Sequence, residues 1–282
     1  FSRGKDALGI DFRGGDRITF EFTEGKKKAN AVLSDALDQA GLSDNMIQYQ
    51  SGGGSRERLQ VTVPFGKGGE AEAVLNKSFV GDENFKKVSQ LRTGASISED
   101  ILKSAIKSLL IALFAILVYV TFRYEFSFAL GAILAILHDI LMTMGIFFLW
   151  GGELSSPVMA ALLTIIGFSI NDTIVIFDRI REDLKLGLPG TFTEIMNVAI
   201  SKTLSRTIIT SGTTLLAAGS LFFFGGGAIN EFAFVLLAGV LTGTFSSIFI
   251  AGSLVLWRNK GEKPKLADET VITQHSISTS EA

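Results

Sequence analysis

Cysteine is absent from the 282-residue sequence, and histidine occurs only twice, at His138 and His275. The lack of cysteine excludes disulfides, thiolate metal sites and cysteine nucleophiles, but it is compatible with either side of a membrane. Neither a G-x-x-x-x-G-K-[ST] phosphate loop nor an H-E-x-x-H zinc motif occurs. The sequence supports no enzyme class that depends on these groups, and we expect no metal site and no bound cofactor.

An excess of charge of either sign is also missing, because 26 Lys and Arg residues oppose 28 Asp and Glu residues. The formal net charge of −2 gives no global attraction to polyanions, so we expect no nucleic-acid partner. Residues 1–6 lack the apolar stretch and the cleavage site of a signal peptide. The charges are unevenly placed, however, since the first third of the chain is charged and the remainder is strongly apolar.

Residues 17–98, after a lead segment of residues 1–16, are predicted to form a small α+β domain. Alternating or β-branched residues predict three strands, and apolar residues at helical spacing predict two helices. The strands are expected at Arg17–Thr23, Met46–Gln50 and Leu59–Val63, and the helices at Ala29–Ala40 and Glu70–Phe79. This order indicates a ferredoxin-like sheet covered by helices, with no catalytic constellation and therefore a binding or mechanical role.

Five apolar segments follow, each near the ~20 residues that a helix needs to cross a bilayer. They lie at Ile106–Thr121, Phe128–Trp150, Pro157–Phe177, Thr207–Phe224 and Phe232–Trp257. We therefore predict a polytopic α-helical membrane bundle over residues 99–258. The amphipathic segment Thr191–Ser205 is expected to lie on the inner surface or to act as a coupling helix. The polar tail, residues 259–282, is expected to be disordered.

The distribution of basic residues predicts how the bundle is oriented, because Lys and Arg are retained in the cytoplasm. They occur in the first and third connections and after the last segment, whereas the second and fourth connections, residues 151–156 and 225–230, have none. This pattern places the N-terminal domain outside and the tail inside. Asp178, Arg179, Arg181 and Glu182 then lie at the cytoplasmic boundary, where we expect them to anchor a helix end.

An ionisable residue, Asp172, lies inside the third apolar segment. A charge at that depth costs at least ~3 kcal/mol on insertion scales, so it marks a pathway for ions or protons. On a helix, Ser169, Asp172 and Thr173 form a narrow polar stripe, with Asn171 beside them. The sequence therefore predicts a proton site on this helix.

The fourth apolar segment offers a partner face, since Arg206, Thr210 and Thr213 recur at helical spacing. Desolvation favours the neutral form of a buried acid, whereas a nearby guanidinium favours its carboxylate, so small movements of Arg206 would change the proton occupancy of Asp172. The alternative is a static ion pair that only fixes packing.

Asp139, in the second apolar segment, is a further proton-pathway candidate. It follows His138, which either makes a structural hydrogen bond or relays protons. Asp139 and Asp172 could together serve an intramembrane aspartyl protease, but that hypothesis gives no role to the Arg206 face or to the external domain.

Short motifs in a specific order run from Leu8 to about Trp257. They are Gly9–Gly15, Phe122–Glu125, Leu137–Asp139, Ser169–Thr173, Asp178–Glu182 and Thr203–Ser211. With these motifs the chain resembles the SecF family, or the SecF half of SecDF fusion proteins, in the RND transporter superfamily. The resemblance implies an additional crossing ahead of the Gly9 motif, which we expect to lie upstream of Phe1.

The resemblance also implies a function in the bacterial plasma (inner) membrane. Members work as accessory subunits of the Sec translocon, with a SecD subunit or SecD half, and use the proton gradient to help pull preproteins out on the external side. Asp172 in the Asn-Asp-Thr motif and Arg206 in the Ser-Arg-Thr motif would be proton-pathway residues, with Asp139 as a further candidate. The expected partners are SecD, the Sec channel, unfolded preprotein and the lipid bilayer.

Two other functions stay open. A proton-driven exporter of small molecules or lipids from the same superfamily would need a substrate cavity between the external domain and the bundle. A structural membrane adaptor would act on its partners whether or not a proton gradient is present.

Overall fold

The structure is a computed structural model that describes residues 7–23, 25–51 and 56–264. The predicted disorder of residues 265–282 lies outside this range. The described chain divides into two compact units. One holds the described residues up to Ser108 with Phe147–Ala161 and Gly219–Phe234, and the other holds Leu109–Ile146, Leu162–Ala218 and the described residues from Val235 onward.

The N-terminal part of the first unit is a four-stranded antiparallel sheet with two helices. Its elements are β1 (Gly15–Thr23), α2 (Asn30–Gln39), β2 (Met46–Ser51), β3 (Arg56–Val63), α3 (Gly68–Ser78) and β4 (Lys86–Thr93). The strand order is β2-β3-β1-β4, which with the βαββαβ element order is the ferredoxin-like arrangement. The predicted fold of this domain is confirmed.

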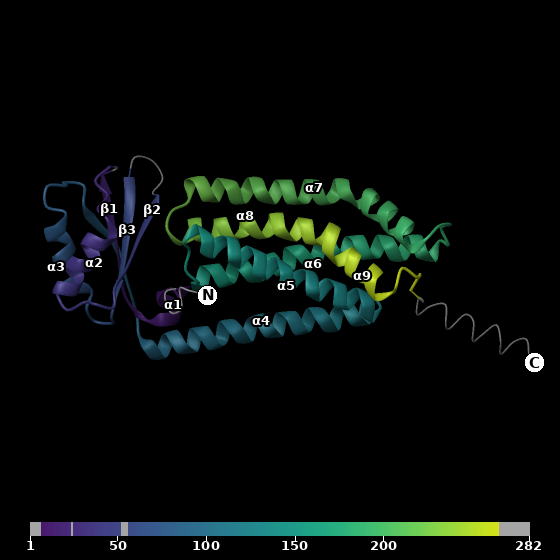
Figure 1. Ribbon diagram of the computed structural model, residues 1–282, viewed down its shortest axis with the longest axis horizontal. Coiled ribbons are helices and arrows are strands. Elements are labelled where there is room, and N and C mark those ends of the chain that lie inside the picture. Colours follow the sequence, from purple (N-terminus) through teal and green to yellow (C-terminus); the bar gives the residue numbers. More distant parts are fainter. Residues whose placement is uncertain (1–6, 24, 52–55, 265–282) are drawn as a thin grey trace, which may run out of the picture. The chain divides into compact units, whose positions relative to one another are not determined.

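Apolar residues at alternate positions of β1 place large side chains on one face of the sheet, where they form its hydrophobic core. Ile18, Phe20 and Phe22 are fully buried on one face, where they pack with Leu33 of α2 and Leu75 of α3. Figure 1 shows both helices on the same side of the sheet. Burial of each large apolar side chain contributes ~1.5–3 kcal/mol, so this face stabilises the domain.

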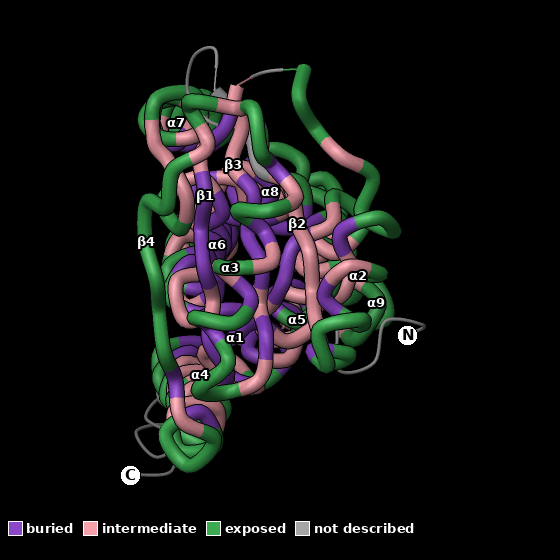
Figure 2. The backbone as a smooth tube through the Cα atoms, turned by 90° about the vertical axis from the view of Figure 1, so that its left-hand side faces the viewer, coloured by how far each residue is buried: buried purple, intermediate pink, exposed green. Residues whose placement is uncertain are grey.

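The fourth strand, β4, was not predicted. Only Thr93 of its eight residues is buried, and Figure 2 shows the strand exposed along nearly its whole length beside the buried β1. An edge strand with no buried face carries no apolar alternation, so the pattern that reveals a strand was missing. Its backbone pairs with β1 in an antiparallel register from Gly15–Thr93 to Glu21–Lys86.

The described residues contain five helices that are long and apolar enough to cross a membrane. They are α4 (Ala95–Arg123), α5 (Phe126–Trp150), α6 (Ser156–Lys185), α7 (Phe192–Phe224) and a composite of α8 (Ala228–Ser246), the π-helix η2 (Ser247–Ala251) and α9 (Gly252–Arg258). The predicted membrane bundle is confirmed. The predicted boundary between residues 98 and 99 falls inside α4.

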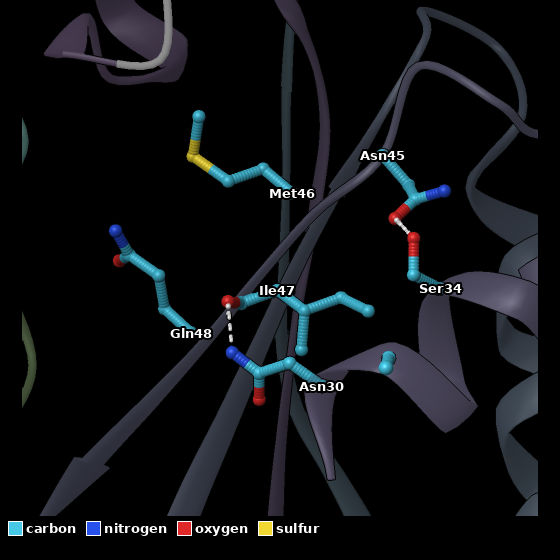
Figure 3. Close-up of a pocket in the computed structure, with 7 residues that line it drawn as sticks. Asn30, Ser34, Asn45, Met46, Ile47 and Gln48 are labelled. Atoms are coloured by element: carbon cyan, nitrogen blue, oxygen red, sulfur yellow. Dashed lines mark hydrogen bonds between the residues drawn. The ribbon is translucent and has the colours of Figure 1, made fainter. Parts of the chain in front are cut away.

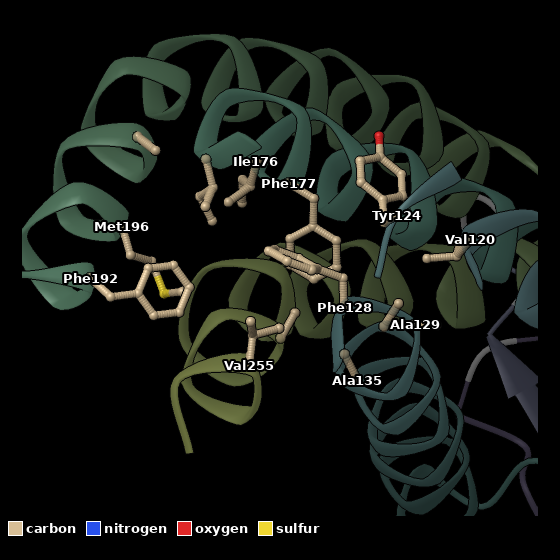
Figure 4. Close-up of a cluster of buried hydrophobic side chains, with 14 residues drawn as sticks. Val120, Tyr124, Phe128, Ala129, Ala135, Ile176, Phe177, Phe192, Met196 and Val255 are labelled. Carbon is tan, nitrogen blue, oxygen red and sulfur yellow. The ribbon is translucent and has the colours of Figure 1, made fainter. Parts of the chain in front are cut away.

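The predicted separate helix over Thr191–Ser205 is wrong, because its residues form the first turns of α7. Its apolar face packs inside the protein instead of lying on a membrane surface. Phe192 and Met196 join a buried cluster of the second unit that also contains Phe128, Phe177 and Val255 (Figure 4). Phe128 and Phe177 meet edge to face with ring centroids 4.9 Å apart.

Glycine allows α6 and α8 to approach closely. A Cβ atom added at Gly239 would lie 2.1 Å from Cδ1 and 2.4 Å from Cγ1 of Ile165. One added at Gly243 would lie 3.2 Å from Cβ of Ser169. These two glycines, four residues apart on α8, therefore act as a small-xxx-small contact face.

We predict that Gly239→Ala lowers the free energy of unfolding by ~1–3 kcal/mol, because Ile165 must leave its position or the helices must separate. Thermal unfolding in detergent would measure the loss. Gly145→Ala in α5 is the matched control, since a Cβ there meets nothing within 4 Å. Equal midpoints for the two variants would contradict the close approach.

Candidate functional site

Buried polar side chains of the second unit come together in what we call the polar seam. It comprises Asp139 and Thr143 of α5, Ser169, Asp172 and Thr173 of α6, Ser246 of α8 and Ser247 of η2. Each of these side chains is buried inside helices that are otherwise apolar. Because burial of an unpaired polar group is costly, the hydrogen bonds of the seam decide which members are structural.

Asp139 is paired on both carboxylate oxygens. Its Oδ2 accepts hydrogen bonds from Oγ of Ser169, at 2.6 Å, and from Oγ of Ser246, at 2.7 Å. Its Oδ1 lies 3.2 Å from Nδ1 of His138. One carboxylate therefore joins α5, α6 and α8.

A second set of hydroxyl contacts extends the seam. Thr173 and Ser247 share a hydrogen bond of 2.9 Å, and Ser247 also donates to the Ser169 carbonyl at 3.3 Å. Sequence reasoning missed Ser246 and Ser247, although two adjacent hydroxyls in an apolar segment were a usable signal. The π-helix that begins at Ser247 could not be foreseen from periodicity, and such segments are frequent at functional sites.

Asp172 differs from Asp139 because its carboxylate is buried without being paired. The residue is 3% exposed, and among the described residues its Oδ2 has no hydrogen-bond partner. The Arg206 guanidinium attracts it electrostatically. Within the described chain no hydrogen bond or ion pair joins the two side chains, and Arg206 is exposed. The structure thus places these residues within electrostatic reach but not in contact.

The structure shows where the hydroxyls of the expected α7 face donate, and the role of that face stays a prediction. Thr210 and Thr213 donate to carbonyls of their own helix, those of Arg206 and Ile209, each at 3.0 Å. Threonine in a helix can satisfy its hydroxyl in this way without a neighbour. Asn171 is exposed as well, so it does not join the seam.

The boundary residues connect the last turns of α6 to nearby helices. Asp178 contacts Arg123 at 3.4 Å, and Arg181 donates to the Arg123 carbonyl at 3.1 Å, so both reach the end of α4. Arg179 pairs within α6 with Glu182, at 2.9 Å. These contacts give the four residues structural partners away from the seam.

No described group of three or more His, Asp or Glu side chains is placed to hold a metal ion. A cleft of about 350 Å³ lies beside α2 and β2 (Figure 3). It is lined by amide, hydroxyl and apolar side chains, among them Asn30, Ser34 and Gln48. None of its lining residues titrates near neutral pH, so it offers no acid, base or cation.

Comparisons with known proteins show the family to which the chain belongs. Residues 73–261 match the family model described as protein export membrane protein SecD/SecF, C-terminal. The protein translocase subunit SecF of Desulfurispirillum indicum is 40% identical over 272 residues, which cover 92% of this chain and 84% of the relative. The chain belongs to the SecD/SecF family. Its SecF relatives are named protein translocase subunits, so the family is one of protein transport. Together with this membership, the five long apolar helices make the chain a multi-pass membrane protein.

SecDF proteins contain this SecF region within a longer chain. The SecDF translocase subunit of Thermus thermophilus is 35% identical over 266 residues, covering 90% of this chain and 36% of that protein. A crystal structure of SecDF from the same organism, titled a translocon-associated membrane protein, superposes with a TM-score of 0.79 at 36% identity. It covers 92% of this chain, which spans 35% of the SecDF chain.

For Asp139 we predict that Asp139→Leu destabilises the protein by ~1–3 kcal/mol, because Ser169 loses its acceptor and Ser246 keeps only the Gly243 carbonyl of its own helix, at 3.1 Å. Asp139→Asn keeps an acceptor oxygen of the same shape and is expected to cost much less. Thermal unfolding of both variants in detergent measures the difference. Equal losses would show that the hydroxyl bonds contribute little.

Proposed function

We propose that this SecF-family chain is an accessory subunit of the bacterial Sec machinery in the inner membrane. Together with a SecD subunit or SecD half, and beside the Sec channel, it uses the proton gradient to assist translocation and release of unfolded preproteins. The gradient supplies about 2.3 kcal/mol for each charge moved through 100 mV, so no bound cofactor is needed.

The observation that carries this proposal is the unpaired Asp172. A buried carboxyl oxygen without a hydrogen bond needs an explanation, and a group that gains and loses a proton provides one. Desolvation favours its neutral form and the attraction of Arg206 favours its charged form. A change in the distance between the two groups would therefore shift the proton occupancy of Asp172.

The exposed Arg206 face supports a SecD partner. Only 17% of the apolar stretch of α7 is buried within this chain, compared with 56% of that of α6. A lipid-facing guanidinium would cost ~2.5–3.5 kcal/mol at the centre of a bilayer, so protein or a wet cleft must cover it. In fused relatives about two thirds of the chain lies outside the region matched here, and it could supply that cover.

The orientation in the membrane is part of the proposal. The connections at Gly151–Ser156 and Gly225–Asn230 contain no Lys or Arg, whereas the ends of α4, α6 and α9 do. By the positive-inside rule the sheet domain then faces the periplasm. Client chains emerging there would meet it.

We predict that Asp172→Asn and Arg206→Gln each abolish the proton-dependent stimulation of preprotein release while leaving assembly intact. Asparagine cannot carry the proton, and glutamine cannot supply the positive charge. Translocation of a preprotein into proteoliposomes, with and without an imposed pH gradient, measures the effect.

Glu182→Gln is the control, since it removes a carboxylate of α6 that is 58% exposed. A fully active Asp172→Asn protein would contradict the proton role. Gradient-driven transport of a small solute in the absence of the Sec channel would favour an exporter. An effect on the partners that persists without a gradient would favour an adaptor.

A further inference from the structure

The lead segment of the first unit is fastened to the start of α6 by backbone hydrogen bonds. The Gly9 amide donates to the Leu154 carbonyl at 2.7 Å, and the Leu154 amide donates to the Ala7 carbonyl at 2.8 Å. Leu8 and Leu154 thereby form a parallel β-bridge. Residues 145 and 147 positions apart are thus joined by two backbone hydrogen bonds just ahead of the first turn of α6.

Glycine is required at the first of these contacts. A Cβ atom at Gly9 would lie 2.9 Å from the Leu154 carbonyl oxygen, closer than such contacts allow. This close approach explains why the first residue of the Gly9–Gly15 motif is a glycine, although Gly9 is not part of the candidate proton site.

Asp11, two residues further along, caps α6 from outside the helix. Its Oδ2 accepts a hydrogen bond of 2.7 Å from the amide of Ser156, the first residue of α6. The first amides of a helix have no partner within it, and a carboxylate there also interacts favourably with the helix dipole. Asp11 is the second residue of the short helix α1 (Ile10–Arg13), which is followed after Gly14 by β1.

A side-chain ion pair reinforces the same junction. Nη2 of Arg17 in β1 lies 2.7 Å from Oε2 of Glu153, and the two side chains are only 14% and 4% exposed. An ion pair this well buried and hydrogen-bonded holds its geometry better than a surface pair does. We use the name clasp for the contacts of Gly9, Asp11 and Arg17 with residues 153–156.

A cleft next to the clasp separates the polar face of the sheet from the helix starts. Its volume is about 460 Å³, and it is lined by Thr19, Arg58 and Ser89 of the sheet and by Pro157 and Ala228 of the helices. The sheet is therefore not packed continuously on these helix starts. The sheet also meets the α7–α8 connection, where Arg58 lies against Gly226, and it continues through β4 into α4. The clasp is the connection that reaches the start of α6.

Helix α6 links the clasp to the candidate proton site. Ser156 and Asp172 are 16 residues apart in one continuous helix, which at 1.5 Å per residue is about 24 Å along its axis. A packed helix moves as a rigid element, so a shift of α6 at Asp172 is carried to its first turn.

We propose that Asp11 is a positioning residue that couples movement of α6 to movement of the sheet domain. The coupling rests on the proposed proton-driven function. The clasp keeps the sheet domain attached to the first turn of α6, so that displacement of the helix is delivered to the sheet where client chains are met. Without the clasp, α6 still responds to protonation but its displacement is not passed on.

The first test separates proton uptake from translocation. The full chain is assembled with its SecD partner in proteoliposomes, where a pH-sensitive dye reports proton uptake and a preprotein reports translocation. Asp11→Ala removes the acceptor and is expected to lower gradient-dependent stimulation about fivefold, the factor that a lost cap of ~1 kcal/mol implies, with proton uptake unchanged. Asp11→Asn keeps an acceptor oxygen and is expected to retain stimulation.

The matched control is Asp35→Ala, which removes an exposed carboxylate from α2 of the same domain. Unchanged stimulation in Asp11→Ala overturns the proposal, and so does a parallel loss of uptake and stimulation. If the proton gradient does not stimulate translocation by the wild-type chain, the proposed function is wrong, and the coupling proposal fails with it.

A covalent replacement of the clasp gives a second test. Because the chain has no native cysteine, Arg17→Cys and Glu153→Cys can be joined selectively by a short bismaleimide. In the Asp11→Ala background this link is expected to restore stimulation, since it reattaches the sheet domain to the start of α6. If the link instead blocks stimulation in a chain that keeps Asp11, the sheet must separate from α6 and the proposal is wrong.

Discussion

The helical half of the structure depends on one buried carboxylate with two hydroxyl donors. Asp139 accepts from Ser169 and Ser246, and so ties three helices together at a single point. The low dielectric inside the bundle strengthens each of these bonds and makes the loss of the acceptor costly. Asp139 therefore fixes the packing of α6, the helix that carries Asp172, against α5 and α8. The glycines of α8 contribute to this arrangement, because they let α8 come close enough for Ser246 to reach the acid.

The two acids in the apolar helices have different surroundings, although they are the same residue type. Asp139 has a partner for each oxygen, so its side chain is held in one position. Asp172 has a buried oxygen without a hydrogen-bond partner and a cation within electrostatic reach. The acid that ties the helices together and the acid that the proposed function requires to change charge are thus different residues, so helix packing need not depend on the one that titrates. The clasp attaches the sheet domain to the helix that carries Asp172.

Much of the fold could be predicted from the sequence, because apolar length and alternation are local signals. The five apolar segments and the strands β1 to β3 are of this kind, and Asp172 could be singled out because an acid in such a segment is rare. The exposed β4 could not be predicted, since it has no apolar face. The hydrogen bonds of Asp139 and the capping of α6 by Asp11 were also invisible, because their partners lie far apart in the chain. The hydrogen bonds of Thr210 and Thr213 to their own backbone could not be predicted either, because a hydroxyl in a helix can turn to its own helix or to a neighbour.

The π-helix at Ser247–Ala251 changes the direction in which the side chains of α9 point. Its wider turn accommodates one residue more than an α-helix would, and one residue corresponds to about 100° around a helix axis. Every side chain of α9 therefore faces a direction about 100° away from the one that an uninterrupted α8 would give it. Val255 owes its buried position against Gly131 of α5 to this offset. Ser247, the first residue of the π-helix, is hydrogen-bonded to Thr173, which follows Asp172 in α6. The change in the direction of the α9 side chains therefore begins at a contact one residue away from the unpaired acid.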